Sequence, residues 1–125
     1  MNMQKFTQKS LEAIQESQNI AIENQNAQVE QEHLLLALLQ QDNSLIKELL
    51  KKIGTSENFE NELENIISKM PKVVGGARPS NGIYVSQDLD ITLTNAEIIA
   101  KKMKDEYVSV EHIMLSMFDN GNRKI

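Results

Sequence analysis

The apolar residues recur along the chain at the three- and four-residue spacings of amphipathic helices. After Ser86 the spacings alternate between four and three, through Leu89, Leu93, Ala96, Ala100 and Met103. This spacing places the five side chains on one face and predicts a helix. A stripe of smaller residues after Thr7 predicts an equivalent helix: Ser10, Ile14, Ser17 and Ala21. Thr7 and Ser86 are expected to cap these helices, because a hydroxyl oxygen accepts from the unpaired amides of a first turn.

An internal repeat relates these two predicted helices. The segment VEQEHLLL at 29–36 recurs as VSVEHIML at 108–115, at an offset of 79 residues and with four identical positions. The same offset aligns Thr7 with Ser86 without a gap. Both repeated segments open apolar helices, which we predict to form the centre of the core. The duplication indicates two similar helical units.

Two shorter helices are predicted between the copies. Leucine and isoleucine pairs recur at helical spacing over 45–53, and Gly54 is suited to end that helix. Thr55 or Ser56 then caps a stripe that runs from 59 to 70 and stops at Pro71, which lacks the amide needed to continue a helix. Residues 71–85 contain both prolines and three of the five glycines, which predicts a loop with a short extended segment at 83–85.

The predicted organisation is a single domain over residues 1–125. Repeat one spans 6–70, a linker loop spans 71–85 and repeat two spans 86–125. By the offset, Ile125 matches Ile46, where the third helix of a repeat begins. We therefore interpret repeat two as incomplete and the chain as a segment of a longer polypeptide.

Composition narrows the possible functions. Apolar residues form 40% of the chain, aromatic residues are few and tryptophan is absent, which favours an aliphatic core between helices. The net charge of −5 argues against binding to nucleic acid, since phosphate contacts need clustered Lys and Arg. Without cysteine there is no disulfide or thiolate metal site. The apolar run 34–39 is too short to span a bilayer, and no signal peptide is visible, so no membrane partner and a cytoplasmic location are expected.

The repeated Glu-His pairs, Glu32-His33 and Glu111-His112, raise the question of metal binding. A zinc-protease helix needs a second His four residues on, and neither copy provides one. We favour a structural role, in which each His begins a core helix and is hydrogen-bonded to a neighbouring loop. The sequence also contains no phosphate-binding P-loop motif and no G-x-S-x-G nucleophile motif. We therefore expect no metal, no cofactor and no enzymatic activity in this chain.

Five segments together resemble the N-terminal domain of Clp-type AAA+ unfoldases: QKFTQKSLEAI, QEHLLLALL, SKMPKVVGG, YVSQDL and DEYVSVEHIML. The resemblance covers about 6–119 and is closer to ClpB-type than to ClpC-type members. It implies an all-α, pseudo-twofold bundle of two four-helix repeats, the second one truncated here. It also implies a homohexameric parent whose ATP- and Mg-binding modules lie C-terminal to this segment.

The same resemblance implies a function in binding unfolded or aggregated polypeptides. The alternative is a ClpC-type domain that docks adaptor proteins or substrates marked with phosphoarginine. A third class, a helical DNA-binding regulator, also fits short helix pairs, but the acidic balance and the lack of a basic recognition helix argue against it.

The site residues that the resemblance implies fall into two groups. The first is a polar patch of Thr7, Asp105 and Glu111, with Ser86, Asn26 and Glu32 as its counterparts in the other repeat. In ClpC-type domains the hydroxyl and the glutamate hold phosphoarginine, and the matching pairs are Thr7 with Glu111 and Ser86 with Glu32.

The second group is an apolar groove that includes Leu93. Two other positions that are usually apolar in ClpB-type grooves are Asn95 and His112 here, which changes the expected depth of the groove. Periodicity alone instead makes Leu93 a core residue. For Thr7 the alternative to a recognition role is a plain N-cap that stabilises its helix by about 1 kcal/mol, and the two roles can coexist.

Overall fold

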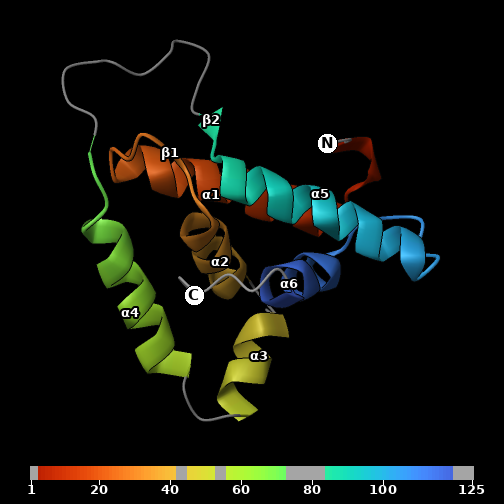
Figure 1. The fold of residues 1–125 in the computed structure, drawn as a ribbon. Coiled ribbons are helices and arrows are strands. Elements are labelled where there is room, and N and C mark those ends of the chain that lie inside the picture. Colours follow the sequence, from red (N-terminus) through yellow and green to blue (C-terminus); the bar gives the residue numbers. More distant parts are fainter. Residues whose placement is uncertain (1–2, 42–44, 53–55, 73–83, 120–125) are drawn as a thin grey trace.

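A computed structural model of the protein describes residues 3–41, 45–52, 56–72 and 84–119 (Figure 1). Within these ranges the chain forms six α-helices, a short 3-10 helix and two strands of two residues each. In chain order the elements are η1 (Met3–Lys5), α1 (Gln8–Glu23), β1 (Gln28–Val29), α2 (Gln31–Gln40), α3 (Leu45–Lys52), α4 (Ser56–Ser68), β2 (Tyr84–Val85), α5 (Gln87–Lys102) and α6 (Val110–Asp119). The predicted all-α fold is therefore confirmed.

The two repeated segments have matching backbones. Helices α1 and α5 are both 16 residues long, and α2 and α6 are both 10 residues long. Each pair begins 79 positions apart in the sequence. The turn after the first helix of each copy contains a non-glycine residue with positive φ, Gln25 at 59° and Lys104 at 61°. Such a conformation is uncommon outside glycine, so its recurrence at equivalent positions shows that both copies follow the same path.

The two halves, residues 3–72 and 84–119, are joined by reciprocal backbone pairing. Strand β1 pairs with β2 in parallel, with Val29 opposite Val85. At the equivalent positions, Phe6 forms a parallel bridge with Val108. Each half thus contributes the residues that precede its first helix to the segment that precedes the second helix of the other half. This exchange is the pattern expected of a pseudo-twofold arrangement.

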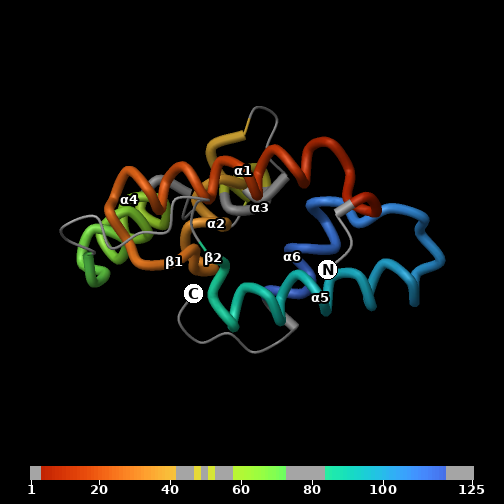
Figure 2. Tube along the Cα trace, turned by 90° about the horizontal axis from the view of Figure 1, so that it is seen from above, coloured from red at the N-terminus to blue at the C-terminus, as the bar shows by residue number. Residues whose placement is uncertain are grey.

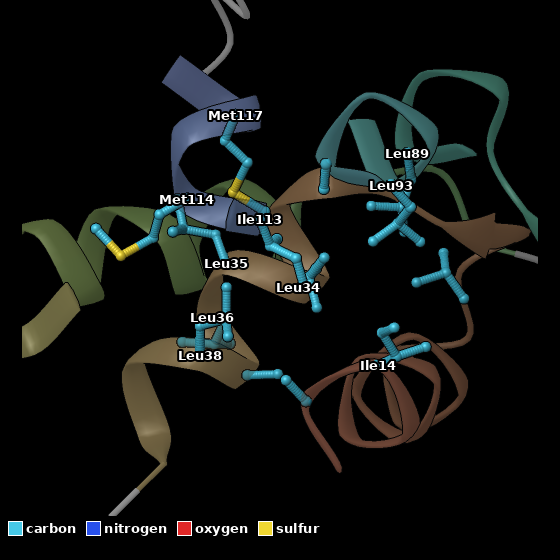
Figure 3. Close-up of a cluster of buried hydrophobic side chains, with 14 of the residues drawn as sticks. Ile14, Leu34, Leu35, Leu36, Leu38, Leu89, Leu93, Ile113, Met114 and Met117 are labelled. Carbon is cyan, nitrogen blue, oxygen red and sulfur yellow. The ribbon is translucent and has the colours of Figure 1, made fainter. Parts of the chain in front are cut away.

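The core lies along α2 and α6, as the sequence predicts. Figure 2 shows these two helices between α1 and α5. Residues 31–39 of α2 are all buried, and Leu34 of α2 and Ile113 of α6 are 0% exposed. Ile14, Leu89, Leu93, Met114 and Met117 belong to the same hydrophobic cluster (Figure 3). Burial of such side chains contributes about 1.5–3 kcal/mol each, so these contacts hold the helices together.

The two predicted shorter helices are also present. Helix α4 packs against α2, and its residues Leu63 and Ile67 are buried, while α3 contacts both α2 and α4. Helix α4 ends before Pro71, and the predicted extended segment is confirmed at Tyr84–Val85. The caps predicted at Gly54 and Thr55, most of the linker loop and residues 120–125 lie outside the described residues.

Candidate functional site

Two surface hollows lie at equivalent places in the two halves. The first-half hollow is lined by Asn26, Ala27, Gln28, Glu30, Glu32, Ile66, Met70 and Pro71. The second-half hollow is lined by Met103, Asp105, Glu106, Tyr107, Ser109, Glu111, His112 and Leu115. Their volumes are similar, about 350 and 360 Å³. Five lining positions correspond through the internal repeat, so the duplicated sequence creates two related surfaces.

Beside each hollow, a histidine near the start of α2 or α6 is hydrogen-bonded to two of the lining residues. His33 Nδ1 accepts from the backbone N–H of Glu30 at 2.8 Å, and His112 Nδ1 accepts from that of Ser109 at 2.9 Å. In the neutral imidazole the proton therefore resides on Nε2. From there His33 donates to Asn26 Oδ1 and His112 donates to Asp105 Oδ2, both at 2.8 Å. The predicted structural role of both histidines is confirmed.

The electrostatic surroundings of His33 support a neutral ring. Burial lowers its pKa from 6.5 to about 4, and the nearby Glu30 carboxylate only partly opposes this effect. The ring is 0% exposed, so a charge on it would have to form without water. His33 is therefore part of the core and is not available as an acid or a base.

The residue that accepts the hydrogen bond from histidine Nε2 differs between the two hollows. Asn26 is 2% exposed, and its Nδ2 also donates to the carbonyl oxygen of Pro71 at 3.3 Å, which ties the turn to the end of α4. Asp105 has a side chain that is 48% exposed. One oxygen of its carboxylate orients His112, while much of the group faces solvent. At this position the second-half hollow therefore has an exposed carboxylate, whereas the first-half hollow has a buried, neutral amide.

Thr7 and Ser86 cap α1 and α5, as predicted. The Thr7 hydroxyl accepts from the Ser10 N–H at 3.2 Å, and the Ser86 hydroxyl accepts from the Leu89 N–H at 3.1 Å. The Thr7 amide also donates to the Val108 carbonyl oxygen at 3.0 Å, only three residues before Glu111. The structure thus places Thr7 next to the segment that leads into α6, although the two are distant in sequence.

The predicted site residues divide by exposure. Asp105 and Glu111 are exposed and Thr7 is partly exposed, all on or beside the segment that enters α6. Their counterparts in the other pair are buried, with Ser86 at 3% and Glu32 at 5% exposure. A ligand in solution can therefore reach the first set of side chains more readily than the second.

The prediction that Leu93 lines an open groove is wrong in this structure. Leu93 is 0% exposed, because its face of α5 packs into the core with α6 (Figure 3). His112 is only 4% exposed, and Asn95 is partly buried, with Nδ2 donating to the Ser116 hydroxyl at 3.4 Å. All three expected groove positions therefore face inward, and the alternative reading of Leu93 as a core residue holds.

Two exposed apolar residues of the second-half hollow were not anticipated. The apolar spacing predicts Met103 on the same helix face as Leu93, but α5 ends at Lys102, and Met103 as the C-cap is 55% exposed. Tyr107 follows it in the turn and is 52% exposed. The sequence signal for this position is a single aromatic residue, Tyr107, directly after the acidic pair Asp105-Glu106. An aromatic residue next to charged residues can indicate an exposed contact position.

The hollow has the chemistry of a binding surface. Carboxylates of Asp105, Glu106 and Glu111 lie beside the side chains of Met103 and Tyr107. Among the described residues, no cluster of three or more His, Asp or Glu side chains could hold a metal ion. None of the described helices is both long enough and apolar enough to cross a bilayer.

Comparison with known proteins identifies related sequences and folds. Residues 5–125 match the family described as Clp repeat (R) N-terminal domain. The chain is 40% identical over 120 residues to the chaperone protein ClpB of Nitratidesulfovibrio vulgaris, covering 95% of this chain and 14% of that protein. It is 36% identical to ClpB of Clostridium tetani, covering 100% and 15%. The chain therefore spans about one seventh of the length of these relatives.

A solved structure has the same fold. The Hsp104 N-terminal domain from Candida albicans superposes with a TM-score of 0.79 at 25% identity. The superposition covers 96% of this chain and 77% of that one. The arrangement of helices described above is therefore shared with an Hsp104 N-terminal domain.

Proposed function

This chain belongs to the Clp repeat N-terminal domain family, and on that premise we propose that it captures non-native polypeptides for a ClpB-like chaperone. The domain binds unfolded or aggregated chains and performs no chemistry itself. ATPase modules elsewhere in a homohexameric, cytoplasmic parent then thread the captured chain. ATP and Mg belong to those modules, and this domain needs no cofactor.

The observation that carries this proposal is the exposed apolar pair at the acidic second-half hollow. Met103 and Tyr107 are each more than half exposed, whereas their counterparts in the first half, Asn24 and Gln28, are polar. Apolar side chains held at a surface next to carboxylates suit a partner that offers both apolar and basic groups. Unfolded polypeptides expose both kinds of side chain.

Leu115 also lines this hollow, but we assign it no part in capture. It is 48% exposed, whereas its counterpart Leu36 is 5% exposed. Leu36 belongs to α2, against which α4 packs, and among the described residues no equivalent helix packs on α6. Leu115 thus corresponds to a core position, while Met103 and Tyr107 correspond to surface positions.

The proposed capture is weak at each site. Ordering a flexible chain costs about 1–2 kcal/mol per residue, which offsets much of the contact energy. Six domains on one ring would raise the effective concentration of binding surfaces and compensate for this weakness. Weak binding also suits a domain that must release its substrate to the ring.

The test is a fluorescence-anisotropy titration of a labelled, permanently unfolded protein with this chain. We expect Met103→Ser and Tyr107→Ser to weaken binding severalfold, because each removes exposed apolar contact area. Ile22→Ser is the matched control, since Ile22 is 43% exposed on α1, away from the hollow. If all four curves coincide, the second-half hollow is not the capture surface.

A second candidate function is recognition of phosphoarginine, as in ClpC-type domains. It is favoured by the position of the Thr7 hydroxyl at the N-terminus of α1, next to the segment that carries Glu111. A helix N-terminus attracts phosphate, and a carboxylate pairs with guanidinium. Titration with free phosphoarginine tests this function. Binding that Glu111→Ala abolishes and Glu32→Ala preserves would support it at the exposed pair, and no binding would exclude it.

A further inference from the structure

The outer face of α5 carries two exposed isoleucines that neither the core nor the proposed capture surface uses. Ile91 is 50% exposed and Ile98 is 47% exposed. They are seven residues apart, so they lie on one side of the helix, about 10 Å from each other along its axis. Thr94 is also exposed between them. Figure 2 shows that α5 lies at one outer edge of the part of the chain that the structure describes.

The fold does not require apolar residues on this face. The counterparts of Ile91 and Ile98 on α1 are Glu12 and Asn19, and both are exposed. Helix α1 has the same length and the same position in its half, so polar residues satisfy this place in the fold. The two isoleucines are therefore an added feature of α5, and exposing them to water has a cost unless a partner covers them.

The charges on α5 indicate what that partner is. Its first turn carries Asp88 and Asp90, and its last turn carries Lys101 and Lys102. The helix is thus acidic at one end and basic at the other, with the isoleucines between. A second α5 lying antiparallel would place an acidic end against a basic end twice, and apolar residues would meet in the middle. The face is complementary to itself.

We propose that two copies of this chain associate through α5 as an antiparallel, twofold-symmetric pair. A twofold axis between Ile91 and Ile98 sets Ile91 against Ile98 of the second copy. The same axis brings Asp88 close to Lys102 of the second copy, because the two residues lie on the same flank of the isoleucine face. In an isologous interface each such contact occurs twice, so one complementary charge pair in the sequence yields two at the interface.

A hollow lies beside Ile98, lined by Thr94, Glu97, Ala100 and Lys101 of α5, by Lys5, and by Asp105, Glu106 and Val108 of the segment that leads into α6. One pair of helices buries less than the roughly 1,200 Å² of a standard interface, so the association is weak. It becomes significant where copies are held close together.

Sedimentation velocity of this chain from micromolar to millimolar concentration is the first test. We expect a reversible monomer–dimer equilibrium whose dissociation constant rises at least about tenfold in Ile91→Asp and in Ile98→Asp. Ile22→Asp is the control, because it places the same charge at an exposed isoleucine on α1. A wild-type chain that stays monomeric at millimolar concentration overturns the proposal, and so does a dimer that Ile22→Asp weakens equally.

A charge-exchange experiment tests the register. Asp88→Lys alone and Lys102→Asp alone each bring like charges together, and both variants should dimerise less than wild type. An equimolar mixture of the two variants restores opposite charges at both contacts, so heterodimers should form. Loss of folding cannot produce this recovery. If the mixture remains as monomeric as each variant alone, the antiparallel register is wrong.

Discussion

His112 Nε2 lies 2.8 Å from Asp105 Oδ2, at the position where the first half of the molecule joins His33 to Asn26. The two pairs share the same backbone contacts and the same distance, but only one includes a carboxylate. The same turn is therefore held by a neutral amide in the first half and by a charged carboxylate in the second half. The charge at Asp105 is not needed to hold the turn.

Replacing Asp105 with asparagine tests that separation. The Oδ1 atom of the new asparagine can accept a hydrogen bond from His112 Nε2, as Asn26 Oδ1 does from His33. We therefore expect the free energy of unfolding to change by no more than about 0.5–1 kcal/mol. Binding of a basic unfolded polypeptide should weaken severalfold, because one carboxylate of the hollow is lost. Urea denaturation and anisotropy titration measure the two effects. A large loss of stability would show that the charge is structural.

The cap at Thr7 can likewise be separated from recognition. Thr7→Ala should lower the free energy of unfolding by about 1 kcal/mol, because the Ser10 amide loses its acceptor. Thr7→Asn keeps a side-chain acceptor and should retain most of that stability. If the hydroxyl itself contacts polypeptide, Thr7→Asn binds more weakly although it is stable. Equal binding by Thr7→Asn and wild type would leave Thr7 as a cap only.

Leu93 should behave as a core residue. Leu93→Ala is expected to lower the free energy of unfolding by about 3 kcal/mol, since the side chain is 0% exposed and its removal leaves a cavity. Ile91→Ala on the same helix should cost less than about 0.5 kcal/mol at dilute concentration, where the chain is monomeric. Chemical denaturation followed by circular dichroism gives both values. Similar values for the two variants would contradict the burial of Leu93.

The stability of the domain should fall as the pH is lowered through the range set by His33. Its pKa in the folded state is about 4, below the ordinary value of 6.5, so between these values the unfolded chain binds a proton that the folded chain does not. Stability is therefore full above pH 6.5 and is lost as the pH falls. From pH 7 to pH 5 the loss attributable to this residue is about 2 kcal/mol.

Denaturation curves of wild type and His33→Gln at several pH values check this expectation. Glutamine can still accept from the Glu30 amide, as in a capping box, but it does not titrate. The variant should therefore show a shallower dependence of stability on pH over this range. Equal slopes in the two proteins would mean that His33 is not responsible.

Much of the fold could be predicted from the sequence, because an internal repeat encodes the same pair of helices in both halves. The offset that aligns Thr7 with Ser86 also aligns α2 with α6, so each copy supports the reading of the other. Pairing between the halves was not predictable in the same way. The Phe6–Val108 bridge and the two-residue strands are too short to produce an alternating pattern. Their partners are set by how the helices pack.

The candidate site was less predictable than the fold. Periodicity identified Leu93 correctly as apolar and inward, while the resemblance to a family suggested a groove there. Met103 is exposed because α5 ends at Lys102, one residue before it, and the apolar spacing alone does not reveal this end point. Accessibility also separates Glu111 from Glu32, two residues in similar local sequences. That difference arises from the packing around each hollow.

The most direct test of the proposed function is to map where an unfolded polypeptide touches this chain. Backbone amide resonances of the isotope-labelled protein would be followed by NMR while an unlabelled unfolded protein is added. We predict that the largest shifts fall between Met103 and Glu111 and at Thr7. Shifts confined to the polar surface around Gln8, Glu12 and Gln40, or no shifts at saturating ligand, would contradict capture at the second-half hollow.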